Sequence, residues 1–318
     1  MEIIAQKPMR LDIYLQKSLQ TPRNQVEQLI RKHGVLVDGK KVFKTGLKLK
    51  GGEVIKYELP DAKKEAPLKI DFDIEIIYED NDLLIINKPP HLIVHPAASV
   101  KEPTLVDWLK HKGISLSTLS GEERHGIVHR IDKETSGALV IAKNNEAHNV
   151  LSRQLEDKSM GRYYLAIIDL PLKENIIVEK AIARHPTKRT KMTISDAGRE
   201  SKSAFIKLAL SKTKSKELIC AKLYTGRTHQ IRVHLESLSR HILNDYTYGF
   251  KGKKSEDTRV MLHAHLIYFK HPKTEKLIIK QAPLFEDFKD IIKKQFNMET
   301  IDEKIHPNNI ISKFDTYF

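Results

Sequence analysis

The sequence has 318 residues, which is enough for about two domains of roughly 150 residues each. Its net charge is +14 and its sequence pI is about 9.5, so a polyanionic partner such as nucleic acid is favoured over a merely solvated basic surface. A single cysteine excludes an internal disulfide framework, and the absence of an apolar leader or of any run near the about 18 apolar residues of a membrane span predicts a cytoplasmic protein.

Residues 9–59 show the pattern of a compact α+β unit. Apolar residues recur at helical spacing in residues 11–15 and 26–30, which predicts two short helices. Residues 35–42 then alternate around an Asp-Gly dipeptide, which is typical of a two-residue β-hairpin turn.

This unit resembles the S4 RNA-binding module. The motifs that carry the resemblance are Arg10-Leu11-Asp12, Arg23, Ile30-Arg31 with Gly34, and Val37-Asp38-Gly39. The resemblance implies a basic face that meets RNA phosphates, and a solvated helical surface is the alternative. The side chains predicted to bind RNA are Arg10, Arg23, Arg31 and Lys32.

The rest of the chain is predicted to form a larger domain. Residues 61–71 are mostly polar and predict a linker. Beyond them, short strand-like runs dominate, helices are expected at 104–110 and 147–155, and no βαβ rhythm repeats. The early strands are expected at residues 74–78, 83–86 and 92–94. Residues 296–318 show little periodicity, which predicts a peripheral tail.

Two polar segments between apolar runs hold residues suited to catalysis. In residues 126–137, Asp132 precedes a Thr-Ser-Gly turn, where a carboxylate either reacts or caps the turn. In residues 225–234, a glycine turn opens a helix whose first turns are crowded with donors that suit a carboxylate or a phosphate; a polar solvent face is the alternative. These donors are Arg227, His229, Gln230 and Arg232.

Four segments in this order resemble the RluA family of RNA pseudouridine synthases. They are Asn87-Lys88-Pro89, His129-Arg130-Ile131-Asp132 with Thr135-Ser136-Gly137, Gly226-Arg227-Thr228-His229-Gln230-Ile231-Arg232, and Leu262-His263-Ala264-His265-Leu266. A further stretch, residues 184–190, resembles the RluD branch, which modifies uridines in a stem-loop of large-subunit ribosomal RNA. One departure is His91, where the family usually has glycine, and it concerns the local turn shape.

The resemblance implies a role for each matching residue. Asp132 corresponds to the catalytic aspartate, Arg232 to the arginine that pairs with it, and Arg130 to the arginine that fills the gap left by the extruded base. Tyr164 corresponds to the tyrosine of the Lys-x-Tyr-x-Ala motif, with the adjacent Tyr163 as the alternative. The remaining candidates are Leu262 for the apolar wall of the pocket and Arg227, His229 and Gln230 for RNA binding.

These residue types suit an isomerisation that needs neither redox change nor energy input. The aspartate can act as a nucleophile or base, and the arginine provides its counter-charge. The tyrosine offers an aromatic face for uracil and a hydroxyl near the ring. No cofactor and no metal is expected, because phosphate-binding glycine loops and the H-E-x-x-H motif are absent. Whether Asp132 attacks C1′, attacks C6 or removes a 2′ proton stays open.

The predicted architecture is therefore an α+β chain with two domains. It consists of an S4-like RNA-binding domain at residues 1–60, a linker at 61–71, a pseudouridine synthase domain at 72–295 and the tail at 296–318. The catalytic domain is expected to contain a large mixed, mainly antiparallel sheet. A monomer without an obligate protein partner or membrane association is expected.

Other classes of protein fit less well. A hydrolase would need a placed nucleophile, and Cys220 lies in an apolar run typical of a buried strand. A kinase would need Asp directly after Arg in the His-Arg-x motif, and the pair His125 and His129 is interpreted as structural rather than zinc-binding. The alternatives that stay open are a non-catalytic RNA-binding assembly factor and a pseudouridine synthase that acts on another RNA, such as tRNA.

Overall fold

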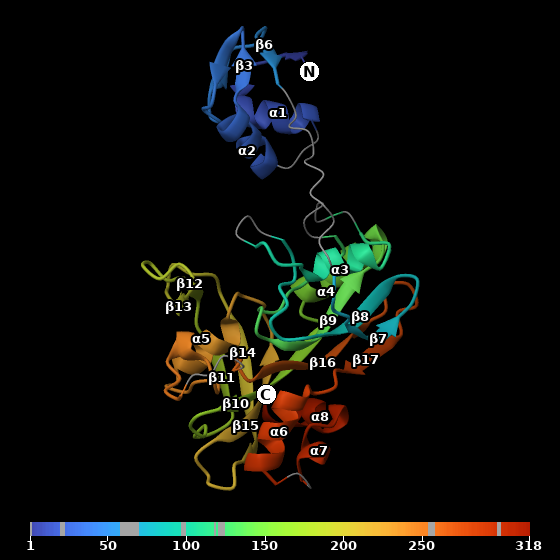
Figure 1. Cartoon of the computed structure of the whole chain (residues 1–318), viewed down its shortest axis with the longest axis vertical. Helices are drawn as coiled ribbons and strands as arrows, with labels where there is room; N and C mark the ends of the chain where they lie inside the picture. Colours follow the sequence, from blue (N-terminus) through green and yellow to red (C-terminus); the bar gives the residue numbers. More distant parts are fainter. Residues whose placement is uncertain are drawn as a thin grey trace. The chain divides into compact units, whose positions relative to one another are not determined.

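The computed structural model describes residues 2–19, 23–57, 70–96, 100–117, 119, 125–253, 258–297 and 300–318. The chain divides into two compact units, Met1–Leu68 and Lys69–Phe318, which we call the N-terminal unit and the C-terminal unit (Figure 1). Most of the predicted linker, residues 61–71, lies outside the described residues. No described helix is both long and apolar enough to cross a membrane.

The N-terminal unit packs two helices against a small sheet. Its elements are β1 (Glu2–Ile4), β2 (Met9–Arg10), α1 (Leu11–Leu19), α2 (Arg23–His33), β3 (Val35–Val37), β4 (Lys40–Val42), β5 (Lys48–Leu49) and β6 (Val54–Lys56). The main sheet has the order β1-β6-β3-β4, and β2 pairs with β5. Leu11, Leu15 and Ile30 are fully buried in its core, as their helical spacing predicted.

The predicted hairpin of this unit is confirmed. Strands β3 and β4 pair with Val37 opposite Lys40, so Asp38 and Gly39 form a two-residue turn. Both turn residues have positive φ, 48° and 77°, which is the conformation that an Asp-Gly pair adopts readily.

The C-terminal unit is built around one large sheet. Its first elements are β7 (Glu75–Glu79), β8 (Leu83–Lys88), α3 (Leu105–His111), β9 (Ser136–Ala142), α4 (Asn145–Glu156) and β10 (Gly161–Ile168). Then follow β11 (Ile176–Glu179), β12 (Ile182–Arg184), β13 (Met192–Ile194), β14 (Lys202–Leu210), β15 (Glu217–Leu223) and α5 (Gln230–Glu236). After the 3-10 helix η2 (Tyr246–Tyr248) come β16 (Leu262–Lys270), β17 (Leu277–Gln281), α6 (Glu286–Gln295), α7 (Ile301–Lys304) and α8 (Pro307–Tyr317).

The sheet order confirms the predicted fold class. Nine strands run in the order β11-β14-β15-β10-β16-β9-β8-β7, with β17 paired to β16. The β16–β9 pair is parallel, while the other pairs along this path are antiparallel, so the sheet is mixed and mainly antiparallel. Helices α6 and α8 lie beside β10 and β15, whereas α3 and α4 lie beside β8 and β9 (Figure 1).

Two sequence-based expectations about the C-terminal unit are wrong. Within the expected peripheral tail, Ile301–Lys304 form α7 and Pro307–Tyr317 form α8, because Ile310 and Phe314, four residues apart, are buried in the same core cluster as β10, β14 and β15. Residues 92–94 form no strand, because the carbonyls of Ile93 and Val94 accept the first backbone N–H groups of α3 instead.

The turn after β8 has the shape that glycine usually provides. His91 has φ 64°, in the left-handed region that β-carbon-bearing residues occupy at a cost of about 1–2 kcal/mol. His91 thus adopts the left-handed conformation that glycine adopts without this steric cost.

Candidate active site

A pocket opens beside the central strands of the C-terminal unit and gathers most of the predicted catalytic residues. Four stretches line it: the loop before β9, the pocket-facing side of β10, the segment from the end of β15 into α5, and the start of β16. The lining residues are Arg130, Ile131, Asp132, Thr135, Arg162, Tyr164, Leu223, Gly226, Arg227, Thr228, His229, Gln230, Ile231, Arg232 and Leu262.

The loop of Asp132 is held by a tight turn and by a glycine. The Thr135 N–H donates to the Asp132 carbonyl at 3.1 Å, and β9 begins at the next residue. Gly137 has φ 113°, and a β-carbon there would lie 2.3 Å from the Ala264 carbonyl oxygen, so only glycine lets β9 approach β16 this closely. The Asp132 side chain stays 20% exposed and open to the pocket.

Arg232 connects Asp132 to a second carboxylate that the sequence analysis missed. Its guanidinium forms a bidentate pair with Asp245 at 2.7 and 2.8 Å, and its Nη1 lies 3.5 Å from Asp132 Oδ2. Burial disfavours the charged guanidinium, but the hydrogen bonds and charge of Asp245 outweigh it and raise the pKa of Arg232. Arg232 therefore reaches Asp132 as predicted, while its tighter partner is Asp245.

His229 is held in a strained position next to this pair. It stands at the N-cap of α5 with φ 57°, its Nδ1 lies 2.9 Å from the Tyr248 hydroxyl, and its Nε2 lies 3.9 Å from Asp132 Oδ2. Burial lowers the pKa of His229, with the charge of Asp132 acting in the opposite direction, so the imidazole is mostly neutral at pH 7.

The sheet separates the two adjacent tyrosines. Neighbouring residues of a strand point to opposite faces of the sheet. Tyr164 lines the pocket, whereas the ring centroid of Tyr163 lies 5.2 Å from that of Phe314 in α8. Burial raises the pKa of Tyr164, so its hydroxyl keeps its proton at neutral pH. This placement favours Tyr164 over Tyr163 for the predicted role.

Gln230 needs a different assignment from the predicted contact with RNA. Its Oε1 accepts from the Thr225 hydroxyl and the Arg227 N–H, and its Nε2 donates to the Lys202 carbonyl and Ser203 Oγ. All four hydrogen-bonding positions of the amide are thus used within the protein, and the side chain is only 2% exposed. Gln230 therefore holds the loop before α5 in place through hydrogen bonds to Thr225 and Arg227.

The other predicted RNA-binding residues differ in their availability. Arg130 is exposed and lies 3.3 Å from His95 Nε2, and Arg227 donates to the Glu200 carbonyl at 3.1 Å. In the N-terminal unit, Arg10 is paired with Asp12 at 2.9 Å. Arg31 and Lys32 are exposed at the end of α2, while the side chain of Arg23 lies outside the described residues.

Lys88 is a second buried cation that the sequence analysis did not assign. Its Nζ donates to the carbonyls of Pro89, Leu92 and Lys133, the residue after Asp132, at 2.7, 2.9 and 3.2 Å. Burial lowers the pKa of Lys88 to about 7, although the charge of Asp132 acts in the opposite direction. The available signal was a lysine at the end of a strand that begins with four apolar residues, and its contacts tie the Asn-Lys-Pro turn to the Asp132 loop.

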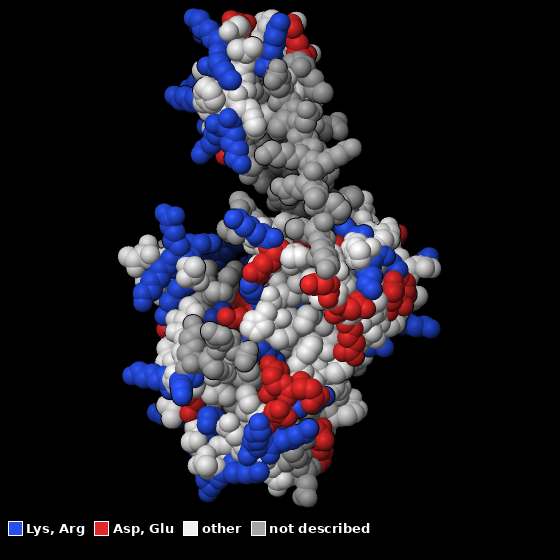
Figure 2. All heavy atoms as spheres, in the orientation of Figure 1, with Lys and Arg blue, Asp and Glu red and all other residues white. Residues whose placement is uncertain are grey.

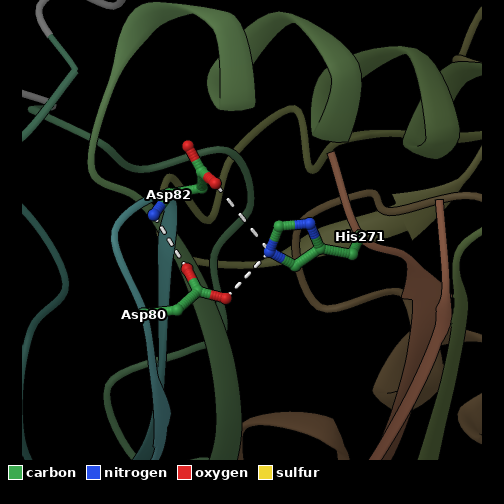
Figure 3. Close-up of side chains that lie close together, drawn as sticks. All are labelled: Asp80, Asp82 and His271. Atoms are coloured by element: carbon green, nitrogen blue, oxygen red, sulfur yellow. Dashed lines mark hydrogen bonds and ion pairs between the residues drawn. The ribbon is translucent and has the colours of Figure 1, made fainter. Parts of the chain in front are cut away.

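One group of described side chains has the spacing of a metal site, and its hydrogen bonds identify it as structural (Figure 3). The His271 Nδ1 accepts from the backbone N–H groups of Lys273 and Thr274, so its Nε2 carries the proton and donates to Asp80 at 2.8 Å. Asp80 also accepts from Tyr78 and from the backbone N–H groups of Asp82 and Leu83. The group fastens the β7–β8 turn to the β16–β17 hairpin.

Two family models match this sequence, one for RNA pseudouridylate synthase at residues 82–237 and one for the S4 domain at residues 9–55. An uncharacterized RNA pseudouridine synthase from Helicobacter pylori strain 26695 is 50% identical over 314 residues, which cover 96% of this chain and 95% of that protein. The ribosomal large subunit pseudouridine synthase D of Vibrio vulnificus is 35% identical over 284 residues, 85% of each chain.

Solved structures show the same fold. Human RNA pseudouridylate synthase domain containing 1 superimposes with a TM-score of 0.57 at 22% identity, over 73% of this chain and 94% of that one. At this level of identity the likeness concerns the fold alone.

Proposed function

The chain belongs to the RNA pseudouridine synthase family, and we propose that it isomerises uridines of large-subunit ribosomal RNA with Asp132 as its essential carboxylate. The reaction detaches uracil from C1′ of its ribose, turns the ring and joins C5 to the same carbon. The enzyme is thus an isomerase that carries an S4 module in front of its catalytic domain.

One observation carries the assignment of Asp132. Among the described residues that line the pocket, it is the only carboxylate. Its side chain receives one hydrogen bond from the described residues, from Arg232 at 3.5 Å, so its oxygens remain available to a substrate. A carboxylate with a nearby cation and unused acceptor capacity suits attack on, or proton removal from, the nucleoside.

The residues around Asp132 suit the other tasks of the reaction, which are to orient the carboxylate, bind uracil and fill the place of the extruded base. Arg232, itself fixed by Asp245, keeps the carboxylate oriented and provides its counter-charge. Tyr164 offers its ring to uracil and a protonated hydroxyl close to it, and Leu262 adds an apolar wall. The exposed Arg130 is free to occupy the place of the extruded base, whose unstacking costs a few kcal/mol.

Sequence relatives and surface charge support ribosomal RNA as the substrate. Proteins named ribosomal large subunit pseudouridine synthase D match over most of this chain at about 35% identity. Lysine and arginine side chains gather around the β12–β13 hairpin of the C-terminal unit (Figure 2), where Arg184, Lys188 and Arg189 are exposed. Such a patch neutralises phosphates of a structured RNA beside the pocket.

If ribosomal RNA is the substrate, the enzyme acts in the cytoplasm. We propose that the enzyme works as a monomer, because Asp132, Tyr164 and Arg232 of the same chain lie together in one pocket. Light scattering after gel filtration should give the mass of one chain without RNA.

Pseudouridine mapping in cells tests the proposal. Ribosomal RNA from cells with and without the gene is treated with carbodiimide, and the adducts are located by primer extension. We expect one or more large-subunit sites to disappear with the gene and to return with the wild type but not with Asp132→Ala. Glu134→Gln, a change in the same loop outside the pocket lining, is the matched control and should restore the sites.

Two results would contradict parts of the proposal. If the ribosomal map is unchanged and the purified enzyme isomerises uridines in bulk tRNA, the substrate is tRNA rather than ribosomal RNA. RNA binding without isomerisation of either RNA would favour the non-catalytic assembly factor.

A further inference from the structure

Among the described residues of the C-terminal unit, three arginine side chains are buried, and one of them has no described counter-charge. Arg162, Arg232 and Arg259 are 8%, 8% and 1% exposed. Arg232 is paired with Asp245 and Arg259 with Asp287. Arg162 makes no hydrogen bond or ion pair with any described residue, and its Nε is fully buried without a partner. Because an unpaired buried guanidinium is costly, Arg162 is suited to bind an anionic ligand.

The position of Arg162 shows where that ligand would bind. Arg162 lies two residues before Tyr164 on β10, and both line the pocket that contains Asp132. A β-carbon on Gly226 would lie 2.8 Å from Arg162 Nη1, so the guanidinium rests against the backbone of the loop that opens α5. Glycine at this position leaves room for the cation, which is thus held at the pocket wall without a carboxylate.

The proposed reaction creates an anion in this pocket. Whichever atom Asp132 attacks, the N1–C1′ bond breaks with its electron pair remaining on the base. The detached uracil then carries a negative charge shared between N1 and the O2 oxygen, and also with O4 unless Asp132 is bonded to C6. Formation of the C5–C1′ bond consumes this charge; C5 then loses its proton and N1 takes one up, which gives neutral pseudouridine. The anion therefore exists between cleavage of the N1–C1′ bond and formation of the C5–C1′ bond.

We infer that Arg162 is a further catalytic residue, whose guanidinium binds a carbonyl oxygen of the detached uracil and stabilises its negative charge. The inference rests on the proposed function. A fixed donor without a competing carboxylate stabilises such a charge strongly, because it is already oriented and partly removed from water. The more exposed Arg130 and Arg227 are better placed for phosphates, which stay hydrated outside the pocket.

The test compares Arg162→Met with Arg162→Lys in the full-length enzyme. Single-turnover isomerisation is followed by tritium release from a large-subunit ribosomal RNA transcript labelled at uridine C5, because that hydrogen leaves when C5 joins C1′. Affinity for the same transcript and the melting temperature of each variant are measured in parallel. Methionine keeps the length of the side chain, and lysine keeps its charge.

We expect Arg162→Met to lower the single-turnover rate at saturating enzyme by about 10²–10³-fold, the loss seen when one donor to a developing anion is removed. Its RNA affinity should stay within about twofold, and its melting temperature should be equal or higher, because an unpaired buried charge has been removed. Arg162→Lys should recover most of the rate, to within about tenfold of the wild type.

Four results would overturn the inference. Weaker RNA binding with an unchanged rate at saturation would assign Arg162 to a phosphate, and a lowered melting temperature with a proportional loss of rate would make it structural. Full activity of Arg162→Met beside an active wild type would remove its role while leaving the proposed function intact. A wild type inactive on both this transcript and bulk tRNA would remove the two together.

Discussion

Among the described carboxylate–histidine clusters of the C-terminal unit, those of Asp80 and Asp132 differ in how much of their hydrogen-bonding capacity is used. Asp80 accepts four hydrogen bonds of 2.6–2.9 Å, one of them from His271. Asp132 accepts one, at 3.5 Å, and the His229 Nε2 stays 3.9 Å away. The first cluster is satisfied within the protein and fastens two hairpins, while the second keeps acceptors open for a ligand.

Backbone strain does not separate the two clusters, because His229 has φ 57° at the start of α5 and Glu275 has φ 57° in the turn that follows His271. The unused acceptors of Asp132 are the feature typical of a site whose partner is a substrate. The comparison indicates that a functional cluster is recognised by hydrogen-bond acceptors that the protein itself leaves unused. The following substitutions test this idea.

The largest expected effect follows from Asp132→Asn. Loss of the carboxylate charge should lower the isomerisation rate by at least about 10³-fold, as for other essential catalytic groups. The free energy of unfolding should change by less than about 0.5 kcal/mol, because the side chain makes one long hydrogen bond. Tritium release and urea unfolding measure the two quantities, and a large loss of stability would place Asp132 with Asp80 as a structural residue.

Asp245→Asn should damage both properties. It leaves the buried Arg232 without its close counter-charge, which should cost about 3 kcal/mol of unfolding free energy and release the guanidinium from its position near Asp132. The double variant Asp245→Asn with Arg232→Gln is the matched control. It should recover stability in urea unfolding but not activity, and recovery of activity would show that Arg232 is dispensable.

Asp80→Asn should lower the stability of the protein and leave its isomerisation rate unchanged, the opposite of Asp132→Asn. The amide can accept fewer hydrogen bonds than the carboxylate and loses the charge next to His271, so we expect a loss of about 2 kcal/mol in unfolding free energy. The isomerisation rate at a temperature well below melting should stay unchanged. A loss of rate without a loss of stability would link this cluster to catalysis.

The pH dependence of stability should distinguish the same variant. Burial disfavours the Asp80 carboxylate, but the hydrogen bonds from Tyr78 and the backbone outweigh it and lower its pKa from 3.8 to about 2. The unfolded chain therefore binds more protons between these values, so the stabilisation is complete above about pH 4 and is lost as the pH falls toward 2. After allowance for solvent screening, the wild type should lose about 1 kcal/mol more than Asp80→Asn between pH 5 and 3 in urea unfolding.

The smallest effect is expected at the turn that follows β8, the strand that links the two clusters. His91→Gly removes a side chain from left-handed backbone and should raise the unfolding free energy by about 0.5 kcal/mol, the balance of relieved strain and added chain entropy. Its isomerisation rate should be unchanged. A destabilised variant would show that the His91 side chain makes a contact worth more than the strain.

The sequence by itself determined the features that depend on neighbours along the chain. The Asp-Gly hairpin, the helix that begins after Thr104 with its capping box, and the turn at Asp132 were all predictable from residues a few positions apart. The resemblance of ordered motifs also identified Asp132, Tyr164 and Arg232 as a set, and they line one pocket.

Only the tertiary structure decided which groups become partners across the sheet. Asp132 and Arg232 are 100 positions apart in the sequence and are brought together by the strand order, and nothing local indicates that Asp245 holds the same arginine. Strand direction in the folded sheet places Tyr164 and Arg162 in the pocket. Packing against the sheet makes helices of residues that lack a strong pattern, because burial of a few apolar side chains outweighs weak local preference.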